Sequence, residues 1–203
     1  PSKIVIKAIN GNDYKKANTI YDKRIKGNNR QEEALGEYLE SELDRLVDEF
    51  TNNKISYDDA RNKIEALAEF NIITKKVENS RKEIDDLHVS KVAFNDAIKY
   101  EANDNYIDAI TEYNAVIEKD SDNYAKAQQK IEELSEEYKN DILIEAEQFA
   151  SENDYKSAIS LIDGALDIIK DDSDLDSQKT TYSGLLEEQI AEERNRKIEE
   201  VKN

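Results

Sequence analysis

The single histidine, His88, is the only side chain that could act as the imidazole base of a Ser-His-Asp nucleophile set. It follows Leu87 within a long helical pattern, and no glycine-flanked nucleophile turn accompanies it. The chain has no cysteine, which excludes thiolate nucleophiles, disulfides and zinc-thiolate sites. We therefore expect His88 to be a packing residue at a helix edge, and we expect the chain to have no catalytic residues.

The segment Asp171–Asp176 contains four aspartates and has the carboxylate density of a calcium-binding loop. An EF-hand loop that began at Asp172 would need glycine at its sixth position and a bidentate glutamate at its twelfth. Those positions hold Ser177 and Ser183. The segment therefore predicts a turn whose aspartates cap the following helix, with no metal and no cofactor; a weak, adventitious cation site is the alternative.

Net charge limits the partners of this chain. It carries 47 acidic and 29 basic residues, for a formal net charge of -18. Duplex DNA and anionic bilayers are bound through surplus lysine and arginine, so we expect no nucleic-acid partner. No apolar run approaches the roughly 18–20 residues of a membrane span, so we expect no direct membrane insertion of this segment. P-loop and dinucleotide glycine motifs are also absent.

Four segments share a tyrosine, an alanine three residues later and a large apolar residue seven residues later. Three of them follow clusters of asparagine and aspartate, which favour turns and helix N-caps. Alanine at the third position is small enough to let a neighbouring helix approach closely. We expect the tyrosines to pack between helices; a ligand cage is the alternative. The segments are Tyr14–Ala17–Tyr21, Tyr57–Ala60–Ile64, Tyr106–Ala109–Tyr113 and Tyr155–Ala158–Ile162.

Helical periodicity fills the intervals between these segments. The chain has five glycines and one proline, so little interrupts a helix. The apolar spacing predicts an all-α protein in which long helices over residues 30–51, 73–102, 122–151 and 174–201 alternate with short ones over 13–26, 56–70, 105–119 and 154–169. We expect one domain over 1–203, with degenerate hairpins over 1–70, two better-formed repeats over 71–170 and a terminal long helix over 171–203.

The two better-formed repeats resemble tetratricopeptide (TPR) repeats. Ala97 and Tyr100 precede Tyr106 at the same offsets at which Ala146 and Phe149 precede Tyr155. The stretches YEANDNYIDAITEYNAVIEKDSDN and FASENDYKSAISLIDGALDIIKDD look like the second half of such repeats. The resemblance implies a helical-hairpin solenoid. Because TPR units have about 34 residues and these have 43–49, we expect protruding long helices and an elongated molecule.

In TPR proteins the first helix of each hairpin lines a peptide-binding groove. The resemblance therefore implies a protein-binding groove and places seven residues in it. Because the chain is acidic, we expect a protein or peptide partner that is basic or amphipathic. The groove positions are Lys91, Phe94, Ile98, Glu101, Asn140, Leu143 and Glu147.

Two functions remain open. One is a non-enzymatic interaction scaffold, and the other is a structural spacer or stalk of a membrane-anchored cell-envelope protein. The absence of methionine suggests that the chain is part of a larger protein, whose anchor would lie upstream. Its richness in Lys, Asn, Asp, Glu and Ile is similar to proteins of low-GC Gram-positive bacteria, where TPR-like ectodomains are common. By that analogy the extracytoplasmic face is favoured over the cytoplasm.

Overall fold

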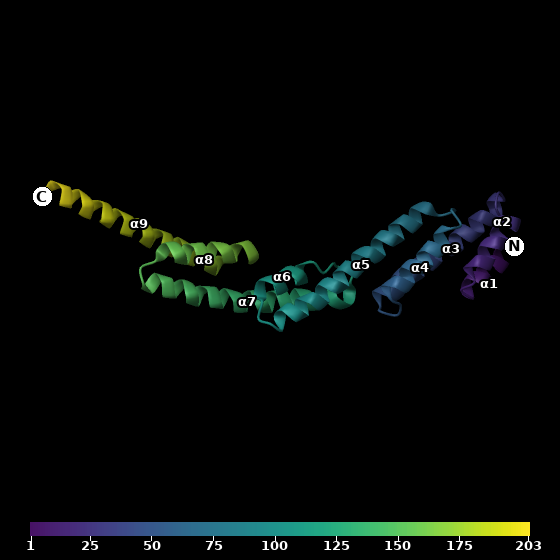
Figure 1. Cartoon of the computed structure of the whole chain (residues 1–203), viewed down its shortest axis with the longest axis horizontal. Helices are drawn as coiled ribbons and strands as arrows, with labels where there is room; N and C mark the ends of the chain where they lie inside the picture. The colour runs from purple at the N-terminus through teal and green to yellow at the C-terminus, as the bar shows by residue number, and fades with distance from the viewer. The chain divides into compact units, whose positions relative to one another are not determined.

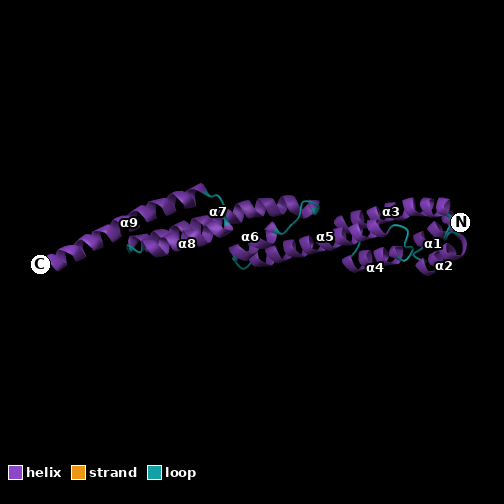
Figure 2. Cartoon of the chain, turned by 90° about the horizontal axis from the view of Figure 1, so that it is seen from above, coloured by secondary structure: helices purple, strands orange, loops and turns teal.

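The computed structural model describes all 203 residues and contains nine α-helices and no β-strand (Figures 1 and 2). The all-α class predicted from the sequence is confirmed. In chain order the helices are α1 (Ser2–Asn10), α2 (Tyr14–Arg24), α3 (Asn29–Thr51), α4 (Tyr57–Ala68), α5 (Thr74–Glu101), α6 (Tyr106–Asn114), α7 (Ser121–Ser151), α8 (Tyr155–Ile168) and α9 (Ser173–Lys202).

The predicted alternation of long and short helices is present from α2 onward, whereas α1 was not among the predicted helices. A further difference lies at the end of α6. The sequence predicts this helix to residue 119, whereas it ends at Asn114. Beyond it, the backbone N–H of Ile117 donates to Ser90 Oγ at 3.0 Å, and Ser90 donates to the buried carboxylate of Asp120 at 2.9 Å. These contacts hold residues 116–120 in a non-helical path.

Three hairpins use the same turn. In each, an Asn or Asp with positive φ is followed by an Asn or Asp that caps the next helix, and the N–H of this second residue donates to the carbonyl five positions earlier. This is a Schellman ending. A tyrosine then opens the short helix. The residue pairs are Asn12–Asp13, Asp104–Asn105 and Asn153–Asp154.

The repeated alanines lie in the core. Ala17, Ala60, Ala109 and Ala158 are all 0% exposed. The large residues that follow them by four positions, Tyr21, Ile64, Tyr113 and Ile162, are at most 6% exposed. The packing role inferred from the spacing is therefore confirmed for all four segments, including the two degenerate ones.

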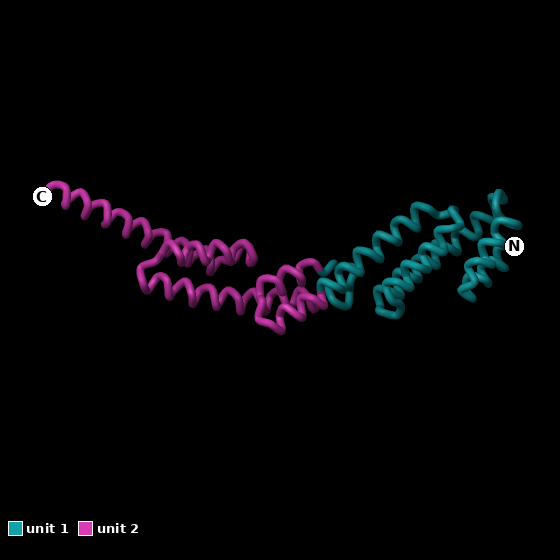
Figure 3. Tube along the Cα trace, viewed as in Figure 1, with its two compact units in different colours: residues 1–93, 116–125 teal, residues 94–115, 126–203 magenta.

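The chain divides into two compact units, shown in teal and magenta in Figure 3. The first comprises residues 1–93 and 116–125, and the second comprises 94–115 and 126–203. Leucines 35, 39, 43 and 46 of α3 form the centre of the first core. In the second unit, Ile142 and Ala146 of α7 pack with Ala158, Ile162 and Ala165 of α8. A single solenoid made of all the hairpins stays a prediction.

Candidate protein-binding groove

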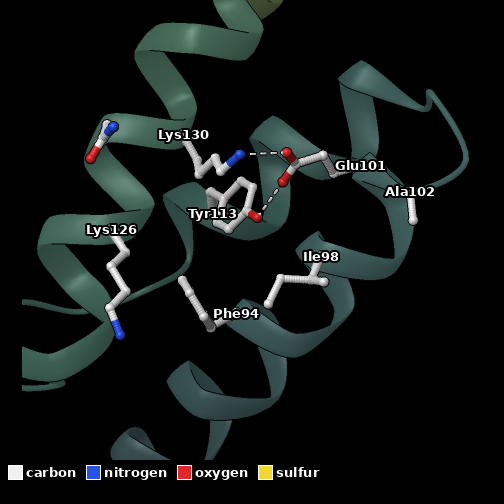
Figure 4. A pocket seen from close by; sticks show the side chains of 8 residues that line it. Phe94, Ile98, Glu101, Ala102, Tyr113, Lys126 and Lys130 are labelled. Atoms are coloured by element: carbon white, nitrogen blue, oxygen red, sulfur yellow. Dashed lines mark hydrogen bonds and ion pairs between the residues drawn. The ribbon is translucent and has the colours of Figure 1, made fainter.

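Three of the predicted groove residues line one recess in the second unit. Phe94, Ile98 and Glu101 lie on one face of α5, because they are spaced by four and three residues along the helix. We call the cavity of about 600 Å³ that they border the Phe94 recess (Figure 4). Its full lining is Phe94, Ile98, Glu101, Ala102, Tyr113, Lys126, Gln129 and Lys130.

Aromatic packing forms the floor of the recess. The turn at Asp104 and Asn105 brings α6 back along α5, which places Tyr113 beside Phe94. The two rings meet edge to face, with centroids 5.6 Å apart and an angle of 65° between planes. Tyr113 is 1% exposed, whereas Ile98 is 45% exposed. An apolar side chain is thus open to solvent beside a fixed aromatic one.

A hydrogen-bonded triad fixes one wall of the recess. Tyr113 Oη donates to Glu101 Oε2 at 2.7 Å, and Lys130 Nζ donates to Glu101 Oε1, also at 2.7 Å (Figure 4). Burial alone would raise the pKa of the Glu101 carboxyl, but the hydrogen bonds from Lys130 and Tyr113 outweigh it and leave that pKa below its ordinary value. Burial and the bond to Glu101 raise the pKa of Tyr113. The triad therefore remains neutral tyrosine, carboxylate and ammonium near pH 7.

The fourth residue predicted in that repeat, Lys91, has a different environment. Its ammonium donates to the carbonyl of Thr51 and to Asn53 Oδ1, each at 3.0 Å, and lies 3.5 Å from the carboxylate of Asp120. The Lys91 side chain is 12% exposed. It ties the end of α3 to α5 within the first unit and does not line the Phe94 recess.

The remaining predicted residues, Asn140, Leu143 and Glu147, line a second, smaller cleft together with Gln178 and Tyr182 of α9. The structure therefore brings the predicted residues together as two sets that share no lining residue, and Lys91 belongs to neither. Peptide binding by these clefts stays a prediction.

The residues considered for chemistry have packing roles. His88 stacks on Tyr57, with ring centroids 4.0 Å apart. Asp172 caps α9 by accepting from the N–H groups of Asp174 and Leu175, as predicted. No group of three or more His, Asp or Glu side chains is arranged to hold a metal ion. None of the nine helices combines the length and apolar character that a bilayer crossing requires.

Five lining residues of the recess were absent from the predicted groove set: Ala102, Tyr113, Lys126, Gln129 and Lys130. Tyr113 was identified only as a packing position, and Lys130 was not singled out. The repeat spacing contained a usable signal for Tyr113, because the residue at that position faces the preceding long helix. Lys130 lies 29 residues from its partner Glu101, and nothing local marks that contact.

Comparison with known proteins finds no matching family model, no matching curated protein and no matching solved structure. The resemblance to TPR repeats thus rests on the quoted residues of this chain alone.

Proposed function

We propose that this protein is a non-enzymatic interaction scaffold whose Phe94 recess binds an amphipathic segment of a partner protein. The observation that carries the proposal is the open apolar floor: Ile98 is 45% exposed and lies beside Phe94 and the buried ring of Tyr113. Burying apolar surface yields about 25 cal/mol per Å², and a pre-formed recess adds little ordering cost.

The charges around the recess indicate the chemistry of the bound segment. Lys126 is exposed at the rim and Lys130 forms one wall, although the chain as a whole is strongly acidic. A segment with one or two apolar side chains and a nearby carboxylate would fill the floor and meet Lys126, because the ammonium of Lys130 already binds Glu101. A strongly acidic partner would be repelled at long range by the net charge of -18. We therefore favour an amphipathic segment over a strongly charged one.

Affinity capture with matched variants tests the proposal. The immobilised wild-type chain is compared with Ile98→Glu, which places a charge in the recess, and with Val89→Glu, which makes the same kind of change at a 62% exposed position of α5. We expect a defined partner that the wild type and Val89→Glu retain and that Ile98→Glu loses. If the three chains capture the same proteins equally, the recess is not a binding site and the alternative of a spacer is favoured.

A further inference from the structure

The end of α9 has an exposed face that is both apolar and basic. Residues 191–203 are exposed, and Ile190, Ile198 and Val201 are 48%, 47% and 88% exposed. At about 100° per residue, Arg194 falls between these apolar side chains and Lys197 falls next to Ile190, while Glu192 and Glu199 fall on the opposite face. We call the set Ile190, Arg194, Lys197, Ile198, Val201 and Lys202 the α9 face.

A second groove in the same unit has the complementary character. It lies between α6, α7 and α8, has a volume of about 600 Å³, and contains apolar side chains with carboxylates at the rim. Ile107 is 42% exposed at its edge. Gly164 opens it further, because an added Cβ there would meet no atom within 4 Å. The residues of this α8 groove that matter here are Ile107, Phe149, Leu161, Gly164, Glu145 and Asp167.

The two surfaces match in length and in charge. Along α8 the groove runs from Ser157 to Ile168. The apolar side chains of the α9 face run from Ile190 to Val201, which is the same separation of about 16 Å at 1.5 Å per residue. The groove offers Glu145 and Asp167 where the α9 face offers Arg194, Lys197 and Lys202. Docking an amphipathic helix into a groove of this kind is a common recognition mode.

We propose that the α9 face of one copy of this chain docks in the α8 groove of a second copy. The same copy cannot supply the occupant, because α9 is one continuous helix whose first part packs on α8 and whose end continues past the α7–α8 hairpin (Figures 1 and 2). Residues 191–203 carry four glutamates and four basic residues, so this segment approaches the acidic body of another copy without net like-charge repulsion.

Sedimentation velocity of the full chain over a concentration series, at about 0.15 M salt, tests the docking. We expect reversible association of the wild type. Arg194→Glu with Lys197→Glu should weaken it at least tenfold, because both reversals face Glu145 and Asp167. The matched control is Arg196→Glu with Lys156→Glu, which makes the same charge change away from the α9 face and the groove lining. This control variant should associate almost as strongly as the wild type.

Two further variants of the groove make the test specific. Glu145→Lys with Asp167→Lys, added to the chain that carries Arg194→Glu and Lys197→Glu, should restore association, because the charges of the groove and of the α9 face are then exchanged. Gly164→Leu should block the groove, whereas Gly164→Ala should not; helical circular dichroism establishes that each chain is folded. A wild-type chain that stays monomeric to about 0.5 mM would overturn the proposal. The proposal would also be overturned if Arg194→Glu with Lys197→Glu left the association unchanged. Neither result bears on the Phe94 recess.

Discussion

Tyr57 and His88 stack face to face, with ring centroids 4.0 Å apart and 15° between their planes. Tyr57 opens the short helix α4, and His88 lies on the following long helix α5. Tyr106 and Tyr138, and likewise Tyr155 and Tyr182, join a short helix to the following long helix in the same way, but these rings are tilted by 35° and 31° with centroids 6.3 Å apart. The lone histidine thus occupies the place that an aromatic residue holds in the other hairpins, and it contributes to inter-helix packing.

Replacing His88 tests this assignment. His88→Ala removes the stacking partner of Tyr57 and should lower Tm by about 2–4 °C, whereas His88→Phe keeps an aromatic ring in place and should stay close to wild type. Thermal unfolding followed by circular dichroism measures both. Equal losses in the two variants would show that the imidazole acts through something other than stacking.

The buried alanine of α8 should resist enlargement. Ala158 is 0% exposed and packs in the core with Ala146 and Ile162. Ala158→Leu overfills this site and should lower the free energy of unfolding by about 1–3 kcal/mol. The matched control is Ala125→Leu, because Ala125 is exposed on α7 and should tolerate the larger side chain. Urea denaturation measures the difference, and equal effects would contradict close packing at Ala158.

Tyr21 should make stability fall at high pH. Burial, and then the hydrogen bond that Tyr21 donates to Glu32 at 2.8 Å, raise the pKa of Tyr21 to about 12. An unfolded tyrosine ionises near pH 10, so the folded state retains this proton more strongly. The resulting stabilisation is complete below about pH 10 and is lost as pH rises toward about 12.

The measurement is the urea midpoint between about pH 9 and about pH 11.5, for the wild type and for Tyr21→Phe. Phenylalanine keeps the ring but has no proton to lose, so the variant should show a shallower fall over this range. A fall of the same steepness in both chains would assign the pH dependence to other tyrosines or lysines.

Lys139 should contribute more to the free energy of unfolding than an ordinary surface lysine does. Its side chain is 9% exposed, and its ammonium lies 2.8 Å from Glu136, 3.3 Å from Asp174 and 3.4 Å from Asp172. Lys139→Met should lower the free energy of unfolding by about 1–2 kcal/mol. This is less than for a fully buried pair, because Glu136 and Asp174 are open to water and rehydrate.

The matched control for this prediction is Lys179→Met. Lys179 pairs with Asp163 at 2.6 Å, but the two side chains are 40% and 49% exposed, far more than the 9% of Lys139. Its removal should not change the urea midpoint measurably. If the two methionine variants were equally stable, Lys139 would stabilise the fold no more than the exposed Lys179–Asp163 pair does.

Local features of this fold could be predicted from the sequence because short-range chemistry determines them. Asn105 and Asp154 cap their helices at the predicted places, and the alanine spacing fixes which face of α6 and α8 is buried. The early end of α6 could not be predicted in this way. It depends on the hydrogen bond from Ile117 to Ser90, a contact across 27 residues that helical periodicity does not encode.

The candidate site shows the same division. Phe94 and Ile98 share a face because of their spacing on one helix, and both line the same recess. Lys91 also fits that spacing, but the carbonyl of Thr51 and the side chain of Asn53 hold its ammonium in the first unit. Tyr113 and Lys130 complete the recess from two other helices. Side-chain packing decides which helices meet, and a periodic pattern in one helix does not specify its neighbours.

The Schellman turns at Asn12, Asp104 and Asn153 affect the kinetics of folding. Each turn joins two helices through very few residues, so closing a hairpin costs little loop entropy. Contacts that are close in sequence form early, and chains dominated by them fold in microseconds to milliseconds. Each hairpin can therefore nucleate on its own as it leaves the ribosome, before the rest of the chain has been synthesised.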